Sequence, residues 1–151
     1  MGLTVRPATA ADRNAVYGML GEFMAYLDAI EPADHPTDIE HLLDQAFGAD
    51  PVCQVLVAES DGQAVGYLSH HPGVWEIFRV LYVVSLFVRS DARNTGARRA
   101  LMDAAKAIAR QKGATRLVWE VWSKNPLAID FYKAIGGAVF EDNLRMSLAV
   151  E

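Results

Sequence analysis

Cysteine is nearly absent from this chain, since Cys53 is the only one among 151 residues. A single thiol cannot form an internal disulfide or a zinc cluster of several thiolates, and it fits a reducing compartment. No apolar run is long enough for a membrane-spanning helix, and the N-terminus lacks a basic region followed by an apolar stretch. We therefore expect a cytoplasmic protein without a membrane partner.

Basic residues are also few, with 14 Lys and Arg against 19 Asp and Glu, for a net charge of -5. Nonspecific binding to nucleic acid needs a basic face, so we expect no nucleic-acid partner. Repeats, linkers and low-complexity tracts are absent as well. What is present is the composition of a globular protein, 52% apolar and 22% charged. The length predicts a single domain over residues 1–151.

The periodicity of apolar residues predicts a mixed α/β fold with the order β-α-α-β-β-β-α-β-α-β. Helices are expected at about 12–28, 37–47, 95–112 and 125–136. Strands are expected at 3–6, 52–59, 64–71, 78–88 and 116–122, with a last strand or strand pair at 138–140 and 144–150. Thr37 and Glu40 form a capping-box pattern, and Pro72-Gly73 is expected to break the chain. The strand-helix-strand unit at 78–122 predicts a parallel pair with a right-handed crossover.

The segment at 88–102 predicts a strand that ends in a tight basic turn and leads directly into an amphipathic helix. Small residues around Gly96 let backbone N–H groups converge, and the helix adds the positive end of its dipole. This pattern favours an anion site suited to a pyrophosphate, and the alternative is a solvated basic helix start. The candidate ligands are Arg93, Asn94, Thr95, Gly96, Ala97, Arg98 and Arg99.

A second motif occupies residues 125–137 and predicts a short helix. Asn125 is the expected N-cap, and Pro126 suits the first turn. Tyr132 is a candidate functional phenol on this helix. The alternative is a core tyrosine that packs with Phe131 and Ile135.

Together, these two motifs resemble the signatures of the GNAT superfamily of acetyl-CoA-dependent N-acetyltransferases. The family pattern Arg/Gln-x-x-Gly-x-Gly/Ala is similar to residues 93–98, where Arg98 replaces the last small residue. The pattern Asn-x-x-Ala-x-x-Phe-Tyr-x-x-x-Gly is present in full, as Asn125, Ala128, Phe131, Tyr132 and Gly136. The likeness covers residues 63–148, and covers the N-terminal third by element order only. It looks most like the diamine and spermidine acetyltransferase branch, although Val84 and Ser85 stand where that branch has an acidic pair.

The resemblance implies a fold with a splayed central parallel strand pair, acetyl-CoA as co-substrate, no metal, and direct transfer to a primary amine of a small molecule or peptide. It implies that the backbone of Leu86, Phe87 and Val88 binds the pantetheine arm and the thioester oxygen. Residues 93–99 would hold the pyrophosphate. Tyr132 would protonate the leaving thiolate, and Asn125 would contact the cofactor. Family habit and the apolar content also favour a homodimer.

The acceptor amine needs a base, because its pKa is near 10 in water. Glu120 lies in the apolar stretch 119–122 and is the candidate, since burial would raise the pKa of its carboxyl. The alternative is an exposed Glu120. Tyr82 and Ser85 are expected to line the amine pocket, with water relaying the proton. His70 and His71 are interpreted as surface histidines.

Acidic residues around the first two helices suit a cationic amine, but such runs are usually solvated. They are Glu22, Asp28, Glu31, Asp34, Asp38 and Glu40. A second functional hypothesis is a CoA-binding sensor that lacks efficient chemistry. Val84 and Ser85 favour it, and the intact Tyr132 argues against it. A dinucleotide-binding fold is excluded, because no Gly-x-Gly-x-x-Gly follows an early strand.

Overall fold

The computed structural model describes residues 2–33 and 37–150. The chain forms two compact units, Met1–Glu120 and Val121–Glu151, and each is described by itself. Asp34 lies outside the described residues. The single domain expected over the whole length stays a prediction. Within the described part, no helix is both long and apolar enough to cross a membrane.

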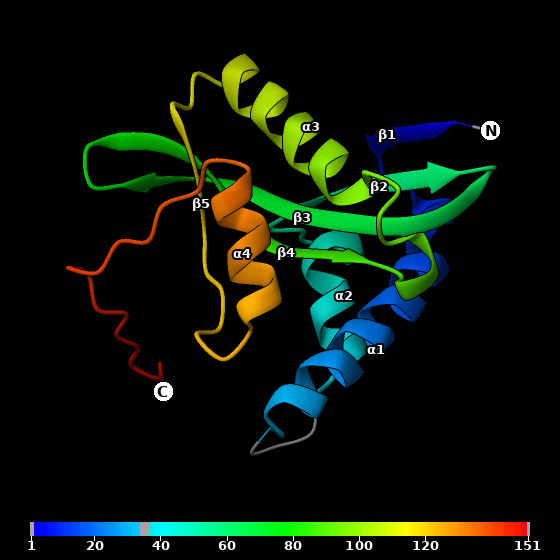
Figure 1. Ribbon diagram of the computed structural model, residues 1–151, viewed down its shortest axis with the longest axis horizontal. Coiled ribbons are helices and arrows are strands. Elements are labelled where there is room, and N and C mark those ends of the chain that lie inside the picture. Colours follow the sequence, from blue (N-terminus) through cyan, green and yellow to red (C-terminus); the bar gives the residue numbers. More distant parts are fainter. Residues whose placement is uncertain (1, 34–36, 151) are drawn as a thin grey trace. The chain divides into compact units, whose positions relative to one another are not determined.

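The first unit is built on a five-stranded mixed sheet, which confirms the predicted α/β class (Figure 1). The strands follow in the order β1 (Leu3–Pro7), β2 (Gln54–Ser60), β3 (Gln63–Trp75), β4 (Phe78–Val88) and β5 (Arg116–Trp119). Neighbours from β1 to β4 are antiparallel, while β4 and β5 are parallel, as predicted. Helices α1 (Arg13–Ile30) and α2 (Ile39–Phe47) cover one face of the sheet, and α3 (Ala97–Gln111) covers the other.

The core between the sheet and α1 and α2 is apolar. Phe23 of α1 stacks on Phe87 of β4, with ring centroids 5.3 Å apart. The rest of this core is Val16, Met19, Leu20, Leu43, Val55, Val57 and Tyr67. On the other face, Gly66 lets β3 and β4 approach closely, because a Cβ there would lie 2.8 Å from the Phe87 carbonyl oxygen. β4 is therefore packed on both of its faces.

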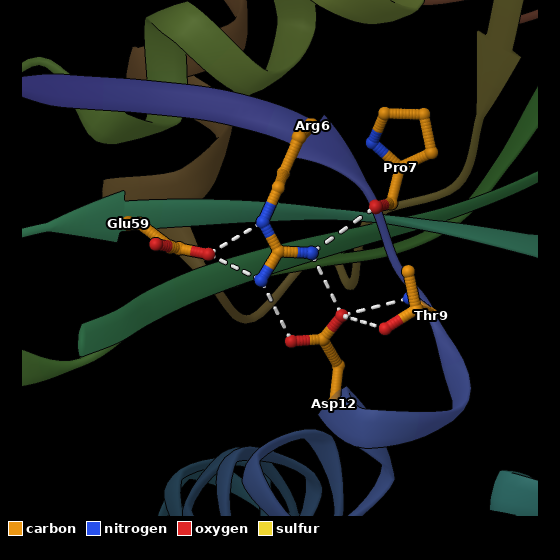
Figure 2. A network of polar contacts seen from close by, with 5 residues as sticks. All are labelled: Arg6, Pro7, Thr9, Asp12 and Glu59. Atoms are coloured by element: carbon orange, nitrogen blue, oxygen red, sulfur yellow. Dashed lines mark hydrogen bonds and ion pairs between the residues drawn. The ribbon is translucent and has the colours of Figure 1, made fainter. Parts of the chain in front are cut away.

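Arg6 joins β1, β2 and the 3-10 turn before α1 in one polar network (Figure 2). Its guanidinium donates to both carboxylate oxygens of Asp12, at 2.8 and 2.9 Å, and also pairs with Glu59. Asp12 accepts a further bond from the Thr9 backbone N–H at 2.7 Å. These donors, Arg6 above all, lower the pKa of Asp12 to about 2. The network therefore fixes where α1 begins.

The second unit contains one helix, α4 (Pro126–Ala134), which begins as predicted. The Asn125 side-chain oxygen accepts from the Ala128 N–H at 3.3 Å and caps it. The helix ends before Gly136, whose φ of +101° is the left-handed conformation that favours glycine.

The predicted last strands at 138–140 and 144–150 are wrong, because no strand forms among the described residues after α4. Leu144, Met146, Leu148 and Val150 alternate as in a strand, yet they are 88–98% exposed. Alternation specifies which face a strand buries, but a strand forms only where another strand supplies hydrogen bonds.

Three predicted boundaries are also wrong. β3 continues through Pro72 and Gly73 to Trp75, because its pairing with β2 ends at His70 and proline is tolerated on an edge. β5 ends at Trp119 rather than at residue 122. The N-cap of α2 is Asp38, whose side chain accepts from the His41 N–H, rather than Thr37.

Candidate active site

β4 and β5 separate partway along their length. Their pairing ends at Val83 and Trp119, but β4 continues to Val88. At the same point, the register with β3 shifts from Ser85 opposite Ser69 to Val83 opposite His70, so Val84 is a bulged residue. A bulge bends its strand and increases the local twist, which accounts for the separation. Beyond Val83, no described strand pairs with the β5 side of β4, so this edge is open to an extended ligand.

The predicted basic turn follows β4 directly. After a 3-10 turn at Ser90–Ala92, Asn94 and Gly96 take left-handed conformations, with φ of +68° and +87°. The Thr95 hydroxyl donates to the Ala92 carbonyl at 2.6 Å and closes the turn. Gly96 is the N-cap of α3 and offers no side-chain cap to the first N–H groups of the helix. Uncapped N–H groups at the start of a helix are the donors that an anion site requires.

Positively charged side chains at this turn also favour the binding of an anion. Arg98 and Arg99 lie in the first turn of α3, which holds no acidic residue. A helix dipole disfavours cations at this end, so both arginines are badly placed for helix stability. They are well placed for an anion that the dipole attracts. The turn at 93–99 therefore suits a phosphate or pyrophosphate, and the assignment of these residues to a pyrophosphate stays a prediction.

Helix α1 contacts this turn along one face. Glu22 forms an ion pair with Arg89, and the Arg93 guanidinium lies 5.6 Å from the ring centroid of Tyr26. Gly18 completes the row, since a Cβ there would lie 3.7 Å from the Arg89 guanidinium. The sequence does not indicate this contact, because nothing in the local pattern links α1 to residue 89. Glu22 belongs to the acidic residues that could form either part of an amine site or a solvated face, and its ion pair with Arg89 helps to fix the turn.

The two residues expected at the amine pocket lie on the α1/α2 face of β4. The hydroxyl of Ser85 lies 2.8 Å from that of Ser69 and 3.3 Å from that of Tyr67. Tyr67 is fully buried, which raises the pKa of its phenol. Tyr82 stacks on His71, with centroids 5.0 Å apart and ring planes at 19°.

The premise that placed Glu120 in a strand is wrong. Its side chain is exposed, one residue beyond the end of β5. Its apolar neighbours in the sequence do not enclose it, because the strand has already ended at Trp119. The desolvation expected to make it a base therefore does not apply.

The two histidines on β3 differ from each other. His70 is 2% exposed, so its interpretation as a surface residue is wrong. Its Nδ1 has no hydrogen-bond partner, and burial lowers the pKa of this ring to about 4. His71 is partly exposed. Among the described residues, no group of three or more His, Cys, Asp or Glu side chains is arranged to hold a metal ion.

Tyr132 and Asn125 belong to the second unit. The ring of Tyr132 meets Phe131 edge-on at 5.4 Å and is partly exposed. Asn125 is buried and serves as the helix cap. The helix thus holds the phenol on a defined backbone without enclosing it completely. The roles assigned to these two residues stay predictions.

An unpaired strand edge that leads into an uncapped, basic helix N-terminus suits a long ligand that ends in phosphates. A family model identifies the class of protein. The chain matches the description "Acetyltransferase (GNAT) family" over residues 19–136 and belongs to that family. Proteins of this family use acetyl-CoA, and the chain is an acetyltransferase by this membership. No curated protein matches the chain.

Solved structures share the fold. An integron cassette protein from the mobile metagenome of V. cholerae is 22% identical over 99% of this chain and 94% of its own, with a TM-score of 0.76. An aminoglycoside acetyltransferase from an uncultured soil metagenomic sample, in complex with sisomicin, is 17% identical over 99% and 97%, with a TM-score of 0.73. A ribosomal-protein-alanine N-acetyltransferase from Brucella melitensis biovar Abortus 2308 is 17% identical over 98% and 100%, with a TM-score of 0.79. At these identities the likeness concerns the fold.

Proposed function

We propose that this protein transfers acetyl from acetyl-CoA to a primary amine of a small molecule or peptide, in a direct ternary complex and in the cytoplasm. The observation that carries the proposal is the continuity of two features. The edge of β4 is open beyond Val83, and it leads within ten residues into the turn at 93–99. Family membership supplies the class of reaction.

The residues present fit the cofactor. Nothing lies within 4 Å of a Cβ built on Gly96, so the surface above the turn is open to a phosphate group. Residues 93–99 would hold the pyrophosphate through N–H groups and guanidinium charge. The backbone of Leu86, Phe87 and Val88 would bind the pantetheine arm and donate one N–H to the thioester oxygen. When bound, acetyl-CoA supplies an activated acetyl group.

The second motif supports the remaining roles. Tyr132 would donate a proton to the departing thiolate, and Asn125 would contact the cofactor while it caps α4. The acceptor site is neutral where the diamine branch is acidic, because Val84 and Ser85 occupy those positions. A polyamine is therefore one acceptor class among several, and the names of the structural neighbours widen the choice to an aminoglycoside or a peptide amine.

A panel of amines tests the proposal. Release of CoA from acetyl-CoA is followed with 2-phenylethylamine, spermidine, sisomicin and a peptide with an N-terminal alanine. We expect turnover with at least one of them. Acetyl-CoA alone should also raise the melting temperature, since a ligand at about 100 times its Kd adds roughly 2.7 kcal/mol. An unchanged melting temperature at millimolar acetyl-CoA contradicts the cofactor assignment.

The second candidate function is a CoA-binding sensor, favoured by the neutral pair Val84 and Ser85. It predicts the same thermal stabilisation by acetyl-CoA but no turnover with any amine of the panel. Mass spectrometry of each amine after incubation separates the two candidates, because only the enzyme leaves an acetylated product.

A further inference from the structure

One face of β3 and β4 carries a continuous row of functional side chains. Successive residues of a strand point to opposite faces, so Tyr67, Ser69 and His71 share a face of β3. Their partners across the pair are Phe87, Ser85 and Tyr82. The contacts confirm the alignment, because Ser69 meets Ser85 and His71 stacks on Tyr82. Tyr67 and Phe87 pack against α1 and α2, so the row begins beneath these helices and leads away from them.

His71 is held in one orientation and one tautomer. Its Nδ1 lies 2.9 Å from the carbonyl oxygen of Pro72. A carbonyl can only accept a hydrogen bond, so the neutral ring must donate through Nδ1–H. The proton on Nδ1 leaves Nε2 with a lone pair, and the stack on Tyr82 fixes the plane of the ring. A partly exposed imidazole with this arrangement is prepared to accept a proton.

The neighbouring histidine lacks these properties. His70 points to the opposite face, is buried, and has an Nδ1 with no partner. His71 has Tyr82 of β4 stacked on it, and the neighbouring His70 senses both His71 and Lys112 electrostatically. From β5, Val118 lies opposite Tyr82 and contributes no charge. The His71 ring thus contacts an aromatic ring and a backbone carbonyl.

The position of this row in the fold points to a catalytic role for His71. The bulge at Val84 lies between Tyr82 and Ser85, at the point where β4 leaves β5. If the β4 backbone holds the thioester there, as the proposed function requires, the reacting carbonyl carbon lies beside this row. We propose that His71 is the general base that accepts a proton from the acceptor amine.

The acceptor ammonium gives one proton to Nε2 of His71, which passes it to water. The neutral nitrogen then forms a C–N bond to the carbonyl carbon, and the C–S bond breaks. The nitrogen loses a second proton, and the thiolate gains one, so each turnover releases one proton to water. Ser85 and Ser69 offer hydroxyl groups that can hydrogen-bond the amine during these steps.

The row also indicates a preference among amines. It offers one imidazole and two serine hydroxyls, and none of its six members is a carboxylate that could bind a second ammonium group. We therefore expect kcat/KM for 2-phenylethylamine to exceed that for spermidine. The reverse order would show that another charged group binds the acceptor.

Kinetics of His71→Gln test the base. The control is His41→Gln, at an exposed histidine of α2. Loss of a positioned base typically lowers the rate by 10²–10⁴-fold, so we expect a loss of this size in kcat/KM at pH 7. The deficit should shrink as the pH rises toward about 10, because the amine then loses its own proton. The control should retain native kinetics at every pH.

A second measurement does not depend on turnover. Long-range ¹⁵N–¹H spectra of the native protein report which ring nitrogen of each histidine carries the proton. His71 should give the Nδ1–H pattern, and its signals are assigned by their loss in His71→Gln. An Nε2–H tautomer overturns the proposal even if no acceptor is found. Native kinetics in His71→Gln also overturn it, whereas an inactive native protein contradicts the proposed function instead.

Discussion

At the scale of single residues, Gly96 permits a sharp test of the anion site. Its φ of +87° disfavours a side chain, but nothing lies within 4 Å of a Cβ built there. Gly96→Asp should therefore fold, at a cost of about 1 kcal/mol. Like charges 4 Å apart repel by about 4 kcal/mol at an effective dielectric of 20, so CoA should bind at least 10²-fold more weakly by calorimetry.

The matched control is Gly96→Asn, which tolerates the left-handed conformation equally well and carries no charge. It should bind CoA within a few-fold of the native protein. Equal losses in the Asp and Asn variants would show that shape, rather than charge, decides the affinity. Native affinity in folded Gly96→Asp would place the pyrophosphate elsewhere.

The proposed role of Tyr132 depends on its phenolic hydroxyl group. Tyr132→Phe keeps the ring that contacts Phe131, so the melting temperature should change little. Loss of a positioned acid should lower kcat by about 10²–10⁴-fold and leave the affinity for acetyl-CoA unchanged. Steady-state kinetics under conditions where chemistry limits the rate measure both values. Full kcat in the Phe variant would assign protonation of the thiolate to water.

Asp12 makes the stability of the fold depend on pH. Its pKa is lowered to about 2, chiefly by the hydrogen bonds from Arg6. A lowered pKa in the folded state adds stability above the ordinary value near 3.9, and this stability is lost as the pH falls toward 2. Asp12→Asn should lower the melting temperature by a few degrees at pH 7, and the gap should close between about pH 4 and pH 2. The exposed Asp28→Asn should show a much smaller gap.

At the scale of elements, the sequence predicts those features that depend only on contacts between neighbouring residues. The turn at 93–99 and the cap of α4 could be identified because each is built from consecutive residues. The bounds of β3 and β5 could not, because they depend on where neighbouring strands are available for pairing rather than on the local sequence. Pro72 remains in β3 only because β2 has already stopped at Gln54, opposite His70.

The row of side chains from Tyr67 to Tyr82 could not be predicted from the sequence, for a related reason. It depends on the register of β3 against β4 and on the bulge at Val84, which reverses the direction of every side chain beyond it. The sequence shows two adjacent histidines, but only the paired strands show that one is buried and the other stacks on Tyr82. The apolar neighbours of Glu120 in the sequence suggest a strand, but the strand ends at Trp119.

At the scale of the whole molecule, residues 144–150 suggest how two copies associate. The apolar side chains at 144, 146, 148 and 150 would share one face of an extended strand, yet they are 88–98% exposed. No described strand of the same chain pairs with this segment. We propose that it pairs across a homodimer, where a second copy supplies the missing hydrogen bonds and covers the apolar face.

Light scattering after gel filtration tests this association at micromolar concentration. The native protein should have twice the 16.5 kDa mass of the chain. Leu148→Asp places a charge on the face that the partner would cover, so it should shift the protein toward the monomer mass. Asn143→Asp adds the same charge just before the segment and should leave the dimer intact. A native monomer contradicts the proposal directly, and equal dissociation by both variants would attribute the effect to net charge rather than to a buried apolar face.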